Sequence, residues 1–247
     1  MKSKTALTKK DVVIVLACVF FLLVNLGAIG AGGRRRAKEA LCLSNLKQWG
    51  TIVYLYTQDN SWILPPSSQS WLGVTEPYIQ DDKVWMCPAA TKTMSEGAKQ
   101  PFAAMMRGGY RGSYGTHDFV TSKVYAHDPG RNAKIWMTSQ VREASRVPVI
   151  ADCKHMFLAT PFHSDEPPAY PEDVICGEGV AKGEMKRYSV NRHNGAINGA
   201  FLDFSARKIG LKELWELDWH RDWNPDNDPP PAWPEWMLNF KDYYETN

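Results

Sequence analysis

The sequence has 247 residues, a formal net charge of +2 and 44% hydrophobic residues, which suffices for one anchor segment and one soluble domain with its own core. Residues 1–33 contain four lysines and one aspartate, so the rest of the chain carries a net charge of −1. This balance gives no basis for a nucleic-acid-binding surface, which would need a clustered excess of basic residues.

The N-terminal part of the chain predicts a membrane-spanning helix. In residues 12–31 only Asn25 is strongly polar, and 20 helical residues cover roughly 30 Å, the hydrocarbon thickness of a bilayer. A cleaved signal peptide is the alternative, because Ala-Ile-Gly-Ala at 28–31 resembles a cleavage site, but this run is longer than the apolar region of a signal peptide. We expect a cytoplasmic N-terminus over 1–11 and a transmembrane helix over 12–33.

The next segment, 34–60, predicts an amphipathic continuation of the same helix. Its large apolar residues recur at spacings of four and three, which places them on one helical face: Cys42, Leu46, Trp49, Val53 and Tyr56. We expect this face to pack against the globular domain. The helix is then both the anchor and part of the core.

The cysteines indicate an exported domain. Cys18 lies in the apolar run, and the other four form an even set: Cys42, Cys87, Cys153 and Cys176. An even number in an exported domain favours two disulfides. Of the three pairings we favour Cys42–Cys87 with Cys153–Cys176. A zinc site is the competing interpretation, with a weak signal because no Cys-x-x-Cys pair occurs. Basic residues flank both ends of the apolar run, so the cysteines decide the orientation, with the domain on the periplasmic or extracellular side of the inner membrane.

Three segments resemble the type IV pilin and type II secretion pseudopilin family, in particular a pseudopilin-like group of planctomycete-type bacteria. Residues 42–50 read Cys-Leu-Ser-Asn-Leu-Lys-Gln-Trp-Gly, residues 85–88 read Trp-Met-Cys-Pro, and residues 192–203 contain Arg-His-Asn-Gly and end in Phe-Leu-Asp. The resemblance covers most of the chain except a loop-rich insertion over about 95–185. It implies an α+β pilin-like fold, in which the second half of the long helix packs on an antiparallel sheet.

The processing site departs from this family. Counting back from Cys42 puts Ala6 where the family has the glycine before the cleaved bond, and Asp11 where it has a glutamate that helps subunits dock. Lys9 and Lys10 occupy positions that are apolar in the family. The resemblance therefore implies an assembly role for Asp11, and we expect the usual processing to be absent.

The exported domain is expected over 61–224. A buried strand is predicted over 147–153, a tight turn at Asn194-Gly195, a strand over 196–204 and a short helix over 211–217. His193 and Asp203 are expected to bond across that turn and stabilise it. The Gly-rich residues 108–115 lack the Gly-Lys-Ser/Thr ending of a phosphate loop and predict a strand and turn instead. We predict no metal or other cofactor.

The C-terminal residues 225–247 predict a Pro- and Trp-rich tail that folds on the surface. The chain has ten tryptophans, and five lie between 215 and 236. They either hold a loop-rich domain together or form a platform for stacking sugars.

The sequence therefore predicts a non-enzymatic, membrane-anchored pseudopilin-like assembly subunit of a type II secretion or type IV pilus-like system. Its partners would be inner-membrane lipid, sister subunits and the secretion or pilus machinery. The alternative is a membrane-tethered module that binds or hydrolyses polysaccharide through its tryptophans.

Overall fold

The computed structural model describes residues 8–28, 30–157, 159–174, 184–224 and 232–241. The chain divides into two compact units, Met1–Ala37 and Lys38–Asn247. We describe each unit by itself.

The first unit contains α1 (Lys9–Ala28) and the beginning of α2 (Ala31–Asp59). The predicted continuous helix is thus two helices in the structure. A cluster of residues with low helix propensity accounts for the interruption, since Gly27, Gly30, Gly32 and Gly33 surround the ends of the two helices. At the new start, the amide of Gly33 donates to the carbonyl oxygen of Gly30 at 3.0 Å.

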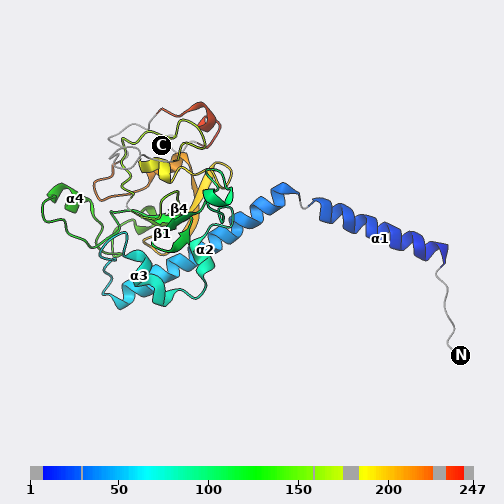
Figure 1. Cartoon of the computed structure of the whole chain (residues 1–247), viewed down its shortest axis with the longest axis horizontal. Helices are drawn as coiled ribbons and strands as arrows, with labels where there is room; N and C mark the ends of the chain where they lie inside the picture. The colour runs from blue at the N-terminus through cyan, green and yellow to red at the C-terminus, as the bar shows by residue number, and fades with distance from the viewer. Residues whose placement is uncertain (1–7, 29, 158, 175–183, 225–231, 242–247) are drawn as a thin grey trace. The chain divides into compact units, whose positions relative to one another are not determined.

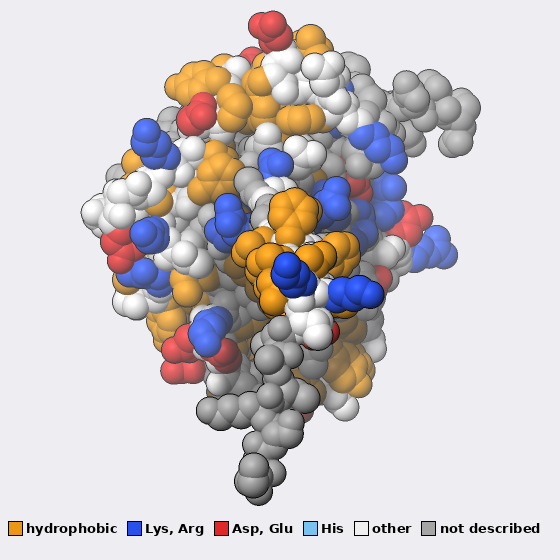
Figure 2. Space-filling view, turned by 90° about the vertical axis from the view of Figure 1, so that its right-hand side faces the viewer, with side chains coloured by type: hydrophobic (Ala, Val, Ile, Leu, Met, Phe, Trp, Pro, Cys, Tyr) orange, Lys and Arg blue, Asp and Glu red, His pale blue; other side chains and the backbone are white. Residues whose placement is uncertain are grey.

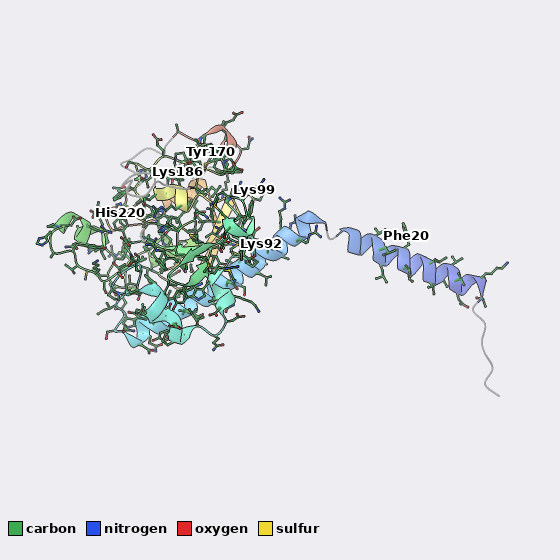
Figure 3. The ribbon with its side chains drawn as sticks, viewed as in Figure 1. Phe20, Lys92, Lys99, Tyr170, Lys186 and His220 are labelled. Carbon is green, nitrogen blue, oxygen red and sulfur yellow. The ribbon has the colours of Figure 1, made fainter. Side chains whose placement is uncertain are left out.

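The side chains of α1 are exposed from Lys9 to Val24. Phe20 is 69% exposed and projects from the helix (Figure 3). Within the part of the chain that the structure describes, no helix reaches the length and apolarity that we require of a membrane span.

Asp11 closes the N-terminus of α1. Its Oδ2 accepts hydrogen bonds from the Thr8 amide at 2.8 Å and the Thr8 hydroxyl at 2.7 Å, and the Asp11 amide donates to Thr8 Oγ1 at 3.3 Å. These reciprocal bonds form a capping box, which satisfies amides at the helix start.

The second unit is an α+β fold, as predicted (Figure 1). Its four-stranded antiparallel sheet has the order β3-β4-β5-β6, with β3 at Tyr114–Thr116, β4 at Pro148–Asp152, β5 at Ala196–Phe201 and β6 at Ala206–Gly210. The central strands β4 and β5 are fully buried, which agrees with their apolar sequences. The tight turn at Asn194 and Gly195 is also confirmed, because both residues have positive φ.

The predicted apolar face of α2 packs on this sheet. Cys42, Leu46, Trp49 and Val53 are completely buried. The first three belong to a core cluster with Tyr114 of β3, Ile150 of β4 and Ala200 of β5, and Val53 packs with Val149 and Leu202. Burial of an apolar stripe against a sheet is the main stabilising term for such a helix.

Shorter elements surround this core. A hairpin of β1 (Met105–Arg107) and β2 (Tyr110–Gly112) turns at Gly108 and Gly109, both with positive φ, as the glycine pattern predicts. The short α-helices are α3 (Trp71–Thr75) and α4 (Pro129–Lys134). The 3₁₀ segments are Glu76–Tyr78, Asp82–Trp85, Met94–Glu96, Ala144–Arg146, Glu184–Arg187, Lys212–Glu216 and Glu235–Met237. The predicted helix over 211–217 is thus a 3₁₀ helix.

The C-terminal tryptophans are largely internal. Trp215 and Trp219 are completely buried and Trp223 is 7% exposed, while Trp233 and Trp236 are partly buried against the same cluster. The indole nitrogen of Trp236 donates to the carbonyl oxygen of Pro168 at 2.9 Å. These contacts agree with the interpretation that the tryptophans hold the domain together. Residues 225–231 and 242–247 of the predicted tail lie outside the described residues.

The surface charges agree with the balanced composition. On the face shown in Figure 2, Lys and Arg side chains are interspersed with acidic, apolar and other polar ones.

Candidate functional site

Four metal-ligating side chains from separate parts of the chain meet inside the second unit. Cys42 lies on α2, Cys87 follows the 3₁₀ segment Asp82–Trp85, Asp152 ends β4, and His193 precedes the turn into β5. One sulfur, nitrogen or oxygen atom from each lies within 4.8 Å of all the others. We call these residues the Cys–Asp–His cluster.

The cluster is closely spaced and buried. Cys42 Sγ lies 3.4 Å from Asp152 Oδ2, and Cys87 Sγ lies 3.4 Å from His193 Nε2. His193 Nε2 lies 3.1 Å from the same oxygen of Asp152. Cys42, Cys87 and Asp152 are completely buried and His193 is 3% exposed. Polar groups buried in this way need partners, because each loses its hydration.

A surrounding layer of donors holds Asp152 in place. Arg192 Nη1 donates to Asp152 Oδ1 at 3.1 Å, and the Asn198 amide of β5 donates to Oδ2 at 3.0 Å. The guanidinium also donates to main-chain oxygens, including that of Cys153 at 3.1 Å. The Arg192 and Asp152 side chains have no exposed surface, so this ion pair is entirely internal. Removing one partner of such a pair is costly, because a buried charge then has no counter-charge.

The contacts within the cluster shift the pKa values of Asp152 and His193 in opposite directions. Burial raises the pKa of Asp152, but the hydrogen bond and charge of His193 and the charge of Arg192 outweigh burial and leave this pKa below its ordinary value. Burial lowers the pKa of His193, yet its contacts with Asp152 and Cys87 raise it to about 10. A carboxylate and an imidazolium therefore face each other at neutral pH when no other cation is bound.

The two thiols differ in acidity. Burial raises the pKa of Cys42 far above its ordinary value, and the contacts with Cys87 and Asp152 raise it further. Burial also raises the pKa of Cys87, but its contacts with Cys42 and His193 lower it overall to about 7. The thiolate form is therefore more accessible at Cys87 than at Cys42.

The geometry does not suit cysteine catalysis. A catalytic histidine uses one ring nitrogen for the nucleophile and the other for the orienting carboxylate. In the cluster, both Cys87 and Asp152 contact Nε2 of His193. The reacting sulfur would also have to reach a substrate, but Cys87 is completely buried.

The three predicted disulfide cysteines that the structure describes are free thiols. Cys42 and Cys87 lie together as the favoured pairing requires, but both are free thiols, and Cys153 is a third buried free thiol. Cys176 lies outside the described residues. The pairing Cys42–Cys87 stays a prediction as far as oxidation is concerned.

The predicted bond between His193 and Asp203 is wrong. His193 pairs with Asp152, while Asp203 Oδ1 accepts hydrogen bonds from the amide and hydroxyl of Ser205. The length of β5 separates the two residues, because His193 precedes this strand and Asp203 follows it, and its six extended residues span about 20 Å. The end of the buried strand at Asp152 was the available signal, since a charged residue there needs a buried partner.

Comparison with known proteins identifies no relative. No family model, curated protein or solved structure matches this chain.

Proposed function

We propose that the chain is a membrane-anchored, pilin-like structural subunit that assembles with copies of itself or with related subunits in the envelope. In this proposal, residues 12–33 insert in the inner membrane, residues 1–11 face the cytoplasm and the α+β unit lies on the outer side. The family resemblance further suggests a type II secretion or type IV pilus-like system.

The observation that carries this proposal is that α1 exposes its apolar side chains, whereas α2 buries its apolar face. The α1 side chains from Val12 to Val24 are exposed and almost all apolar, whereas α2 buries its apolar face on the sheet of the second unit. Exposed apolar side chains over several helical turns require a lipid or protein partner. A long helix on an antiparallel sheet is compatible with a pilin-like arrangement.

The packing of the domain favours a structural role over the polysaccharide-binding alternative. A stacking platform needs an exposed aromatic face. Trp215 and Trp219 are completely buried and contribute to the core.

Cys18 can report contact between the α1 helices of two subunits by forming a disulfide cross-link. Cys18 is exposed on α1, whereas the other described cysteines are buried. Mild oxidation of the full-length Cys176→Ser variant in native membranes should form a dimer linked through Cys18. The matched Cys18→Ser, Cys176→Ser variant should stay monomeric. A monomer in both samples, or an equal dimer in both, would contradict assembly through α1.

The role of the Asp11 charge is tested separately from its cap. Asp11→Asn keeps an oxygen that accepts from Thr8 but removes the charge, whereas Asp11→Ala removes both. If the charge docks subunits, both variants should reduce the Cys18 cross-link. If Asp11 acts only as a cap, Asp11→Asn should cross-link like the unchanged chain.

Membrane localisation and orientation are tested by alkaline washing and by protease accessibility. The full-length protein should stay with the membrane after alkaline washing, and protease added outside the inner membrane should degrade the α+β unit. Release by the wash would refute the anchor.

A further inference from the structure

We propose that Cys42, Cys87, Asp152 and His193 form a closed, tetrahedral structural site for one zinc-class divalent ion. This inference goes beyond the assembly function and does not depend on it. It rests on the convergence of four ligand atoms, on their spacing, on the chemistry of the set and on the buried shell around it.

Three of the six distances between ligand atoms are close to the edges of a zinc tetrahedron, and all six lie within 4.8 Å. With Zn–S bonds of about 2.3 Å and Zn–N or Zn–O bonds of about 2.0–2.1 Å, the edges from sulfur to nitrogen or oxygen are about 3.5 Å. Two of the four edges of this kind, Cys42 to Asp152 and Cys87 to His193, are both 3.4 Å. The edge from nitrogen to oxygen should be about 3.4 Å by the same geometry. It measures 3.1 Å between His193 and Asp152.

Hydrogen bonding alone explains the convergence less well. Nε2 of His193 faces both Cys87 Sγ and Asp152 Oδ2, but one N–H cannot point at two acceptors with good geometry. Oδ2 of Asp152 in turn is approached by Cys42, His193 and the amide of Asn198. A central cation removes this competition, because every ligand then directs a lone pair toward the same point.

The donor set also favours zinc. Thiolate sulfur and imidazole nitrogen are preferred zinc ligands, and a carboxylate oxygen is accepted as well. Two thiolates and one carboxylate contribute three negative charges. A divalent ion and the buried guanidinium of Arg192, 3.1 Å from the other oxygen of Asp152, balance them. A neutral assembly is what a completely buried site needs.

The surrounding residues act as a second layer of contacts. Arg192 and the amide of Asn198 fix both oxygens of Asp152, which sets the direction of its remaining lone pair. The Tyr114 hydroxyl of β3 donates to Cys42 Sγ at 3.3 Å. Contacts of this kind orient ligands and tune the metal in known sites. All four ligands are buried, so the site is closed and serves stability rather than catalysis.

The ion would connect segments that are far apart in the sequence. Cys42 belongs to the long helix, Cys87 to the segment after Asp82–Trp85, and Asp152 and His193 to the sheet. A Cys42–Cys87 disulfide would join only the first two of these segments. The metal site joins all of them.

The test uses the full-length protein in detergent, reduced and freed of metal, and titrated with Co²⁺ and then Zn²⁺. We expect one Co²⁺ per chain, with thiolate-to-cobalt charge transfer, the visible bands of tetrahedral cobalt, and loss of both when zinc replaces it. Zinc at about 100 times its Kd should raise the Tm by about 5–10 °C.

Matched cysteine variants assign the ligands. Cys87→Ser should lower zinc affinity by more than about 100-fold, since loss of a second-layer contact alone costs 10–100-fold. Cys153→Ser alters a thiol that is equally buried but outside the cluster, and should keep full binding. Because Cys87→Ser can fail to fold, the metal-dependent Tm of the unchanged chain provides an independent readout.

Three results would overturn the proposal. The first is a reduced wild-type chain that shows neither charge transfer nor a zinc-dependent Tm. The second is equal binding by Cys87→Ser and the unchanged chain. The third is protein isolated from its own membranes with a Cys42–Cys87 disulfide and no metal, which would support the disulfide prediction instead.

Discussion

Substitution of Gly50 by alanine tests whether α2 is pressed directly against the turn between β5 and β6. Gly50 lies in the middle of α2, where alanine normally stabilises a helix by about 1 kcal/mol relative to glycine. A β-carbon built on Gly50 would lie 2.1 Å from the carbonyl oxygen of Phe204 and 3.0 Å from its carbonyl carbon. The obstacle is backbone, which cannot rotate away as a side chain can.

The expected cost follows from this distance. An unstrained contact needs more than 3.0 Å, so α2 and the turn must separate by roughly 1 Å over a closely packed interface. Overpacking of this kind costs about 1–3 kcal/mol, and a backbone obstacle belongs at the upper end of that range. After the gain in helix propensity, Gly50→Ala should destabilise the unit by about 2 kcal/mol. For a unit of this size, the Tm should fall by roughly 4–8 °C.

Thermal unfolding followed by circular dichroism on the full-length protein in detergent measures this effect. Gly32→Ala is the matched control, because Gly32 also lies in α2 but has no atom within 4 Å of the added carbon. The control should leave the Tm of the α+β unit unchanged. A Tm for Gly50→Ala equal to or above that of the unchanged chain would refute the close contact between α2 and the turn.

Three further predictions concern buried groups. Burial lowers the pKa of His117 to about 3, so this histidine is neutral in the fold, and its own contribution to stability should be complete above about pH 6.5. As the pH falls below that value, the unfolded state takes up the proton first and the free energy of unfolding should decrease by about 1.4 kcal/mol per pH unit; urea denaturation at pH 7 and 5 should show this slope, and a smaller one in His117→Gln. Trp49 is completely buried, so Trp49→Ala should cost about 3–5 kcal/mol in the same assay, and a loss below 1 kcal/mol would contradict its place in the core. Arg192→Met removes the guanidinium partner of the buried Asp152 carboxylate and should cost about 3–5 kcal/mol. Arg111→Met breaks a half-exposed ion pair and should cost less than about 1 kcal/mol, and equal costs for the two variants would refute the importance of burial.

Local patterns predicted much of the fold. The apolar spacing of residues 42–56 follows from helix geometry alone, because residues three and four apart share a face whatever packs against them. The Asn194-Gly195 turn and the Gly108-Gly109 turn follow from the ease with which these residues adopt positive φ. The interruption between α1 and α2 was harder to predict, since the glycines that favour it are also common in helices that pack closely.

In the capping box of α1, one residue, Asp11, has two possible physical roles. The family resemblance implies that the acid at position 11 is a docking charge between subunits. The structure shows that the same carboxylate accepts two hydrogen bonds from Thr8 and caps α1. The spacing Thr-x-x-Asp at 8–11 indicates such a cap in the sequence itself, directly before the apolar run.

By itself, the sequence determined the two-part character of the chain: an apolar segment, followed by a helix with one apolar face that leads into a domain with buried strands. These features depend on side-chain types and on periods of two or 3.6 residues. Only the tertiary structure shows that the residues of the Cys–Asp–His cluster lie together. Its ligands lie at positions 42, 87, 152 and 193, with no short spacing to indicate a common site. They meet because α2 packs on β3, β4 and β5, which brings the end of one strand, the start of another and a helix face to one point in the core.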